Sequence, residues 1–245
     1  MDIIRTWIEG FHQMPINNSE SAHPADSDSD PDPGARGFFI SFEGAESSGK
    51  STQASLLTSW MKERGYTVLR TREPGGTEVG EKLRSILLGD GEEMVPATEA
   101  LLFAAARAEL VHTVIVPALQ RGEVVICDRY IDSSIAYQAF GLGLEEDDVL
   151  AINRWALREA IPNLTIVLGK GRELVSSGEI AQPDRIETRG EDFHRRVRMG
   201  YAKLARRHPK RIVLVDTGSG VEETAAKIKE IVMARLVVGR QTSKE

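Results

Sequence analysis

The chain has 245 residues, of which 41% are hydrophobic and 28% charged, and its formal net charge is −6. This composition predicts a soluble globular protein with room for one large α/β domain, or for a domain and a tail. The acidic balance argues against a nucleic-acid surface as the main function, and without a run of 18 apolar residues no membrane span is expected. The single cysteine, Cys127, lies in an apolar run and is expected in the core, which favours a reducing, cytoplasmic compartment.

Residues 1–36 are predicted to be an extension in front of the folded domain. Pro, Ser and Asp dominate residues 17–36, which predicts a disordered acidic linker. Ahead of it, apolar side chains recur at helical spacing over residues 3–11 and form a short amphipathic stripe. Arg5 is the only arginine before the linker, so the segment is not a transit peptide. The stripe could dock weakly on a partner or belong to a dispensable extension, and the lack of a recognisable motif favours the second.

From residue 37 to 238, short runs of Val, Ile, Leu and Phe alternate with helical patterns. The predicted strands are 38–43, 66–71, 123–127, 164–168 and 211–215. The predicted helices are about 50–64, 78–88, 97–120, 130–140, 146–160, 188–207 and 221–237. This alternation predicts an α/β fold, a five-stranded parallel sheet with helices on both faces, followed by a C-terminal tail at 239–245. Ligands of such sheets bind at the carboxyl ends of the strands, so motifs there carry most weight.

The first predicted strand leads into Gly-Ala-Glu-Ser-Ser-Gly-Lys-Ser at residues 44–51, which has the G-x-x-x-x-G-K-[ST] pattern of a P-loop. Its backbone N–H groups would surround an anionic phosphate, helped by the positive end of the following helix. Lys50 would reach the β- and γ-phosphates, and the hydroxyl of Ser51 would bind Mg²⁺. The predicted ATP-binding residues are Gly44, Ala45, Glu46, Ser47, Ser48, Gly49, Lys50, Ser51 and Thr52.

Charged residues follow the next two predicted strands. Arg72 comes just before the turn Pro74-Gly75-Gly76, where its guanidinium would suit a phosphate monoester; the alternative is a surface arginine beside a turn. Asp128, at the end of the third strand, is placed to hold Mg²⁺ directly or through water. Arg129 beside it would give a second cation for a phosphoryl group, unless the two form a purely structural pair.

Phe103 and Arg107 lie on one face of the helix predicted at 97–120, spaced i, i+4. The ring could stack on a nucleobase while the arginine donates hydrogen bonds to a carbonyl edge of that base. For this helix alone, a core phenylalanine with a solvated arginine is the better interpretation.

Taken together, these segments resemble the thymidylate kinase family of P-loop nucleoside monophosphate kinases, over about residues 38–235. The segments that carry the resemblance are Phe42-Glu43-Gly44 before the P-loop, Thr71–Thr77, Leu102-Phe103 through Arg107, Asp128–Tyr130 with Asp132–Gln138, and Asp184–Glu187. The Arg-Glu-Pro-Gly-Gly-Thr and Ser-Ser-Ile-Ala-Tyr-Gln segments are specific to this family among P-loop kinases.

The resemblance implies a P-loop kinase fold with a short lid at about 169–185. It also implies a cytoplasmic homodimer that transfers the γ-phosphoryl group of ATP to dTMP with Mg²⁺, giving dTDP and ADP for dTTP synthesis. In such an enzyme thymine would stack on Phe103, Arg107 would donate to its carbonyl, and Tyr137 would crowd C2′ of the sugar. The implied dTMP-binding residues are Glu46, Arg72, Phe103, Arg107, Arg129, Ser134, Tyr137 and Gln138, and the implied metal ligands are Ser51 and Asp128.

The chain departs from the family pattern in its predicted lid. Gly169 stands where an acid is expected, and with Ser47 and Ser48 the P-loop contains no arginine, so a catalytic arginine would have to come from the lid. The candidate catalytic residues are Lys50, Arg72, Arg129, Arg172 and Arg185, with Lys170 a weaker one. Ala139 and Leu142 also replace a glycine and an arginine after Gln138. Two alternatives therefore stand beside a dTMP kinase: a kinase with another acceptor, and a nucleotide-binding relative with weak or no turnover.

Overall fold

The computed structural model describes residues 37–45, 47–89, 93–157, 160–170 and 184–242. Its centre is a five-stranded sheet of order β2-β3-β1-β4-β5 in which every pair of neighbours is parallel. The strands are β1 (Phe38–Gly44), β2 (Val68–Arg72), β3 (Val124–Asp128), β4 (Leu164–Gly169) and β5 (Ile212–Asp216). The predicted fold class is confirmed, and each strand starts or ends within two residues of its predicted position.

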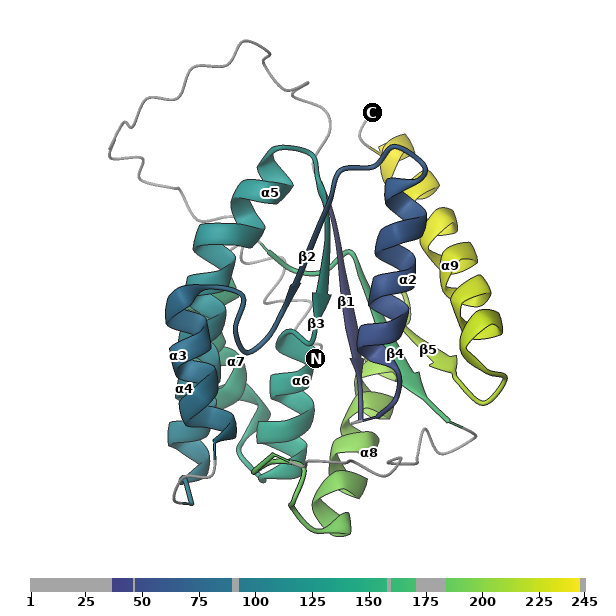
Figure 1. Cartoon of the computed structure of the whole chain (residues 1–245). Helices are drawn as coiled ribbons and strands as arrows, with labels where there is room; N and C mark the ends of the chain where they lie inside the picture. Colours follow the sequence, from purple (N-terminus) through teal and green to yellow (C-terminus); the bar gives the residue numbers. More distant parts are fainter. Residues whose placement is uncertain (1–36, 46, 90–92, 158–159, 171–183, 243–245) are drawn as a thin grey trace, which may run out of the picture. The chain divides into compact units, whose positions relative to one another are not determined.

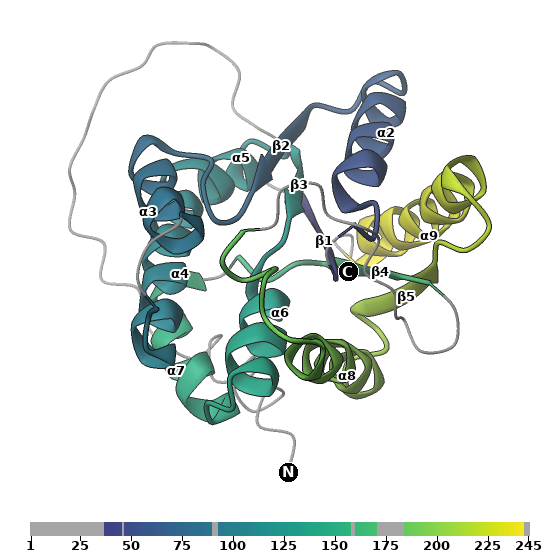
Figure 2. The same cartoon turned by 60° about the horizontal axis from the view of Figure 1, so that its bottom comes forward.

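Helices cover both faces of the sheet (Figures 1 and 2). The α-helices are α2 (Lys50–Lys62), α3 (Glu78–Leu88), α4 (Pro96–Leu110), α5 (Val116–Gln120), α6 (Ile131–Ser134), α7 (Glu146–Leu157), α8 (Glu191–Arg207) and α9 (Val221–Thr242). Two π-helical segments, η1 (Val111–Ile115) and η2 (Ile135–Gly141), continue α4 into α5 and extend α6. α2 and α9 pack on one face, α5, α6 and α8 contact the other, and α3, α4 and α7 form a layer beside them.

The core follows from the apolar strands predicted above. Side chains of β1, β3 and β4, such as Ile40, Ile126 and Ile166, are fully buried and pack with Leu57 and Met61 of α2. Burial of this kind is the main favourable contribution to folding, at about 25 cal/mol per Å² of apolar surface. Cys127 is buried, as expected.

The run Pro96–Gln120 is long and apolar enough to cross a membrane by length and composition alone, with a mean hydropathy of 1.5 over its most apolar window. In the structure 39% of that window is buried, and the run packs within the domain, with α4 against α3 and α7 and α5 against β3. It also carries two fully buried charged residues, Glu99 and Arg107, each with hydrogen-bonded partners. These contacts are those of a helix that packs on its neighbours with one face and exposes the other.

Strand register brings the sequence motifs together. Arg72 at the end of β2 pairs with Asp128 at the end of β3, and Asp128 pairs with Phe42, two residues before the P-loop glycine Gly44. Three segments far apart in the chain therefore meet at one edge of the sheet. The predicted extension 1–36, Glu46, Arg172 with most of the predicted lid, and residues 243–245 lie outside the described residues, and the predicted domain boundaries stay a prediction.

Candidate active site

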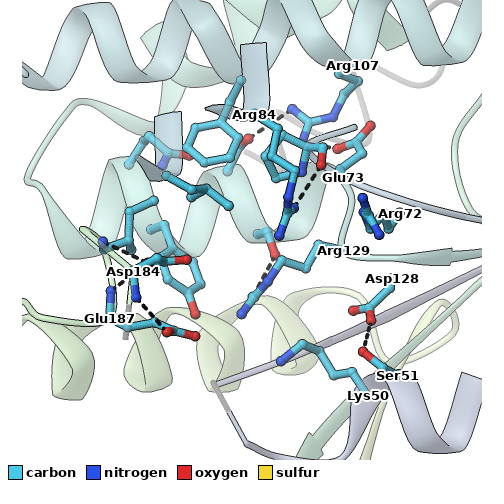
Figure 3. A pocket seen from close by; sticks show the side chains of 18 of the residues that line it. Lys50, Ser51, Arg72, Glu73, Arg84, Arg107, Asp128, Arg129, Asp184 and Glu187 are labelled. Atoms are coloured by element: carbon cyan, nitrogen blue, oxygen red, sulfur yellow. Dashed lines mark hydrogen bonds and ion pairs between the residues drawn. The ribbon is translucent and has the colours of Figure 1, made fainter. Parts of the chain in front are cut away.

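A cavity of about 380 Å³ opens at the carboxyl ends of β2 and β3. In Figure 3, Lys50 and the Ser51–Asp128 pair lie at the lower end of the view, Arg84 and Arg107 lie at the upper end, and Arg129 lies between them. The structure brings many predicted site residues to this one cavity, namely Ser47, Lys50, Ser51, Arg72, Phe103, Arg107, Asp128, Arg129, Ser134, Tyr137 and Gln138. Gly44, Ala45, Ser48, Gly49, Thr52 and Arg185 are described but do not line it.

The P-loop has a backbone that suits its glycines. Gly44 has φ 132°, and a Cβ there would lie 2.3 Å from the carbonyl oxygen of Leu168, so no other residue fits. Gly49 has φ 86° and precedes α2 without a side-chain cap, which leaves the N–H groups of the first helical turn for a ligand. The ammonium of Lys50 is held against the loop, because Nζ donates to the carbonyls of Gly44 at 3.2 Å and Ala45 at 2.7 Å.

The hydroxyl of Ser51 donates to Oδ2 of Asp128 at 2.5 Å, which joins the first turn of α2 to the tip of β3. Two oxygen ligands fit Mg²⁺, since this ion usually takes one or two protein oxygens and completes its shell with phosphate and water. Among the described residues there is no group of three or more His, Cys, Asp or Glu residues that could hold a metal ion by itself. The donor set therefore fits a cation that arrives with a nucleotide.

Four arginines line the cavity, namely Arg107 of α4 and a group of three: Arg72, Arg84 and Arg129. Arg72 pairs with Glu81 at 3.0 Å, and Arg84, half-buried on α3, donates to the carbonyl of Pro74 at 2.9 Å. Burial lowers the pKa of Arg84, and the positive charges of Arg72 and Arg129 lower it further, while Glu81 and Asp184 oppose the shift. Like charges held this close favour an anion between them.

Arg129 has an uncommon backbone conformation for a residue with a side chain, with φ 68°. Its N–H donates to the carbonyl of Phe42 at 2.8 Å, and the next N–H, of Tyr130, donates to Oε1 of Glu43 at 2.8 Å. The guanidinium donates to the carbonyl of Gly44 at 3.1 Å and lies 5.0 Å from the centre of the Tyr137 ring. Strand β1 thus holds the arginine in place from both its main chain and its side chain.

Comparison with known proteins identifies the family. A model of the family described as thymidylate kinase matches residues 42–228. The chain belongs to the thymidylate kinase family. The thymidylate kinase of Exiguobacterium sp. is 43% identical over 206 residues, which cover 83% of this chain and 97% of the relative. That of Geotalea uraniireducens is 42% identical over 212 residues, covering 83% of this chain and 100% of the relative.

The fold agrees with a solved member of this family. The crystal structure of thymidylate kinase from Ehrlichia chaffeensis matches 80% of this chain and 98% of that chain with a TM-score of 0.68 and 30% sequence identity. The resemblance drawn from the sequence motifs is thereby confirmed, and with it the prediction of a P-loop nucleoside monophosphate kinase.

Within this family fold, Arg107 is buried and held by several partners. Only 1% of its side chain is exposed, and it donates to Oε2 of Glu73 at 2.6 Å, Oγ of Ser134 at 2.9 Å and Oδ1 of Asn153 at 2.5 Å. Phe103, one turn earlier, is half-buried and lines the cavity. The alternative of a core phenylalanine with a solvated arginine is therefore wrong.

The ion pair of Arg107 and Glu73 is incompletely satisfied. Oε1 of Glu73 and Nε of Arg107 are buried and have no hydrogen-bond partner among the residues that the structure describes. Burial raises the pKa of Glu73 to about 7, although the charge of Arg107 and its hydrogen bond act in the opposite direction. A carboxyl group with a perturbed pKa in a cavity is a common mark of a functional site.

Arg185, predicted as a catalytic arginine of the lid, has another partner. It donates to Oε2 of Glu99 at 2.7 Å and to the carbonyl of Leu87 at 3.1 Å, and 14% of its side chain is exposed. The described contacts therefore hold its guanidinium on the helix layer beside the cavity.

Sequence reasoning missed Arg84, Glu73 and Glu99. Arg84 lies three residues after Glu81, the partner of Arg72, and therefore on the same face of α3. This spacing could have predicted that Arg84 lies near Arg72. Glu73 directly follows Arg72 in the Arg-Glu-Pro-Gly-Gly-Thr segment. The sequence gives no separate reason to assign its carboxylate a role. Glu99 lies four residues before Phe103 on α4, and its spacing alone would have placed it on the same face.

Glu73→Gln is expected to change the pH dependence of stability. Between pH 4.5 and about 7 the folded wild type keeps a proton on Glu73 that the unfolded chain releases, so its free energy of unfolding falls as pH rises. The Glu73→Gln protein lacks this proton and should gain stability relative to wild type across that window, by up to about 3 kcal/mol, and then level off. Urea unfolding at a series of pH values measures the difference.

Glu81→Gln is the matched control with the opposite sign. The N–H of Gly76 and the charge of Arg72 hold the pKa of Glu81 below its ordinary value, although burial opposes them. Its stabilising contribution is therefore lost as pH falls below about 4.5. A difference between wild type and the Glu73→Gln protein that stays constant from about pH 4.5 to 8 would contradict the environment described for Glu73.

Proposed function

We propose that this chain transfers the γ-phosphoryl group of ATP to dTMP, giving dTDP and ADP for the synthesis of dTTP in the cytoplasm. Membership of the thymidylate kinase family supports the reaction. The observation that carries the proposal is the distribution of charged groups along one cavity. A P-loop lysine and a serine–aspartate pair lie at one end. Three arginines and a buried arginine–glutamate pair lie toward the other end. Two phosphorylated substrates need this arrangement.

At the donor end, the ATP phosphates would lie in the P-loop formed by residues 44–52. Lys50 would exchange its bonds to loop carbonyls for the β- and γ-phosphates, and the open first turn of α2 would add backbone N–H donors. Ser51 and Asp128 would hold Mg²⁺, which when bound neutralises charge on the phosphates. Glu46 in the loop is proposed to face the sugar and phosphate of dTMP.

At the acceptor end, Arg72, Arg84 and Arg129 are proposed to hold the phosphate of dTMP. The base would lie against Phe103, with Arg107, Ser134 and Gln138 around its polar edge. Arg107 is fixed by Glu73 and Asn153, so its remaining donor capacity is oriented before the base binds. Tyr137 lines the same cavity, where it would crowd C2′ and disfavour a ribonucleotide.

The chemistry needs alignment and charge neutralisation. Two like charges 4 Å apart at an effective dielectric of 20 repel by about 4 kcal/mol, so the cations that face the cavity must offset this repulsion. The attacking oxygen of dTMP is already ionised, and therefore no general base is required. Arg172 and Arg185 remain the proposed lid arginines, and Arg185 would have to leave Glu99 to reach the transferring group.

We also propose a homodimer formed through the layer of α3, α4 and α7. These helices pack side by side (Figures 1 and 2), and each exposes a large apolar side chain, Ile86, Leu101 and Trp155 respectively. Trp155 is 86% exposed, which is unusual for a ring of this size unless a partner covers it. Residues 3–11 are proposed as a weak docking segment because of their amphipathic spacing.

The reaction is tested with a panel of dTMP, dUMP, UMP and CMP as acceptors for the full chain, with ATP and Mg²⁺, in a coupled assay for ADP. We expect dTMP to give the highest kcat/KM and a turnover above about 1 s⁻¹, the low end for kinases. ADP formation with another acceptor but none with dTMP would move the proposal to a different monophosphate kinase. Thermal stabilisation by ATP and dTMP without any turnover would identify a nucleotide-binding relative instead.

Arg72→Ala and Arg84→Ala are each expected to raise KM for dTMP by about tenfold to a hundredfold, because each removes a charge-assisted hydrogen bond to the acceptor phosphate. KM for ATP should stay within about threefold of wild type. Arg121→Ala is the matched control, since Arg121 is exposed and pairs with Glu123, directly before β3 and away from the carboxyl edge of the sheet. An unchanged KM for dTMP in both cavity variants would remove them from the acceptor site.

Trp155→Glu is expected to convert the dimer into a monomer, because a charge on the apolar layer of α3, α4 and α7 opposes its burial. Sedimentation velocity at several concentrations measures the mass. Met199→Glu provides the control, since Met199 is also exposed but lies on α8. A dimer that persists in the Trp155→Glu variant, or a wild type that is monomeric, contradicts this interface.

A further inference from the structure

Glu99 has an unusual environment for a carboxylate. It is fully buried in the first turn of α4, and donors from two other segments converge on it. Oε2 accepts from Arg185 at 2.7 Å and from Arg189 at 2.5 Å. Oε1 accepts from Nε2 of Gln138 at 3.1 Å and from Arg189 at 3.2 Å. The carboxylate therefore connects the end of the predicted lid and the residues just after it to a side chain of the cavity.

This carboxylate is ionised at neutral pH. Burial raises the pKa of Glu99, but the hydrogen bonds and charge of Arg189 and the hydrogen bonds from Arg185 and Gln138 outweigh burial and lower the pKa below its ordinary value. An ionised carboxylate accepts hydrogen bonds and cannot donate one. Whatever side chain meets Oε1 must therefore present a donor.

The partner at Oε1 is the amide of Gln138, which can present either of two ends. An amide offers N–H donors at one end and a carbonyl acceptor at the other, and the hydrogen-bond network decides which end points where. Because Glu99 requires the N–H₂ end, the carbonyl end of Gln138 remains for a ligand. Gln138 is 2% exposed and lines the cavity, so this choice sets the chemistry of the cavity wall.

We propose that Glu99 is a positioning residue that fixes the amide of Gln138 with its carbonyl oxygen toward the base, so that the cavity selects a base with an N–H donor at that edge. The inference rests on the proposed function, in which the base lies against Phe103. Thymine and uracil carry an N–H group at N3, whereas N3 of cytosine is a hydrogen-bond acceptor. A carbonyl oxygen at this wall thus favours the imide bases and opposes cytosine.

The spacing of α4 supports this role. Glu99, Phe103 and Arg107 lie at i, i+4 and i+8, so they share one face of the helix. Phe103 and Arg107 line the cavity, whereas Glu99 does not. Glu99 contacts Gln138 on η2, which does line it. Arg185 and Arg189 hold the carboxylate from the other side and keep it charged.

Glu99→Gln tests the inference because it changes hydrogen-bond polarity at nearly constant shape. The carbonyl of the introduced amide is expected to take the position between Arg185 and Arg189, which places its N–H₂ group against Gln138. The amide of Gln138 then turns over and presents donors to the base. We expect the ratio of kcat/KM for dTMP to that for dCMP to fall by about tenfold to a hundredfold, and the ratio of the two affinities measured by calorimetry to fall with it.

Arg189→Gln is the matched control. It removes an ion-pair partner of Glu99 but leaves the carboxylate, and hence the orientation of Gln138, in place. Its kcat/KM for dTMP and its kcat/KM for dCMP can both decrease. We expect the ratio of the two to stay within about threefold of wild type. A purely structural role for Glu99 predicts instead that both variants lose activity with an unchanged ratio, and that result would overturn the inference.

The affinity measurements separate this inference from the proposed function. If wild type turns over neither nucleotide but binds dTMP more tightly than dCMP, the kinase assignment fails and the affinity ratio still tests Glu99. A wild type that binds dCMP as well as dTMP overturns the orientation of Gln138, and one that binds neither overturns both proposals. Should Glu99→Gln fail to fold, Gln138→Leu replaces it: leucine offers the base no hydrogen-bond acceptor, so the dTMP:dCMP affinity ratio is expected to fall, and an unchanged ratio would refute the inference.

Discussion

The end of strand β1 imposes the constraint on which the rest of the site depends. Its last residue, Gly44, begins the P-loop, while the carbonyl of Phe42 and the carboxyl group of Glu43 hold the main chain on both sides of Arg129. The guanidinium of Arg129 returns to the carbonyl of Gly44 at 3.1 Å. The P-loop and Arg129, the arginine proposed for the acceptor phosphate, are thus fixed to three consecutive residues, so their separation cannot change independently of the strand.

Glu43 also joins this strand end to the opposite layer of the fold. Its Oε2 accepts from Ser133 at 2.5 Å and from Tyr201 of α8 at 3.0 Å. Burial raises the pKa of Glu43 to about 8, with the nearby charge of Asp132 adding to the shift and the hydrogen bonds and Arg129 opposing it. A buried carboxyl group with this many directed donors fixes positions more than it stabilises the fold, because its desolvation offsets much of the gain. The same balance between desolvation and fixed position applies at Glu73, where a buried ion pair fixes Arg107 at the end of the cavity that is proposed for the base.

How much of the fold and of the candidate site could be predicted depends on how far apart in the sequence the interacting residues lie. The five strands and the P-loop depend on local composition, and parallel pairing then brings Arg72 beside Asp128, so the edge of the sheet could be derived from the sequence. The burial of Arg107 could not be derived in this way, because its partner Glu73 lies 34 residues away. The sequence of the helix alone predicts a solvated arginine. Arg185 could be identified as a candidate but not placed, since its contact with Glu99 spans 86 residues and depends on how the segment before α8 folds. The π-helical form of η2 also has no signal in the local sequence.

The loop after Gln138 illustrates how packing changes the meaning of a substitution. The resemblance drawn from the sequence expects a glycine at Ala139 and an arginine at Leu142, near the acceptor, but neither residue lines the described cavity. Gly141 between them is required, since a Cβ there would lie 2.6 Å from the ring of Phe193 on α8. Arg196, also on α8, donates to the carbonyl of Gly141 at 2.7 Å and 3.1 Å through two of its nitrogens. The carbonyl of Gly141 is thus held by a cation from another helix, and η2, the segment that carries Gln138, packs against α8.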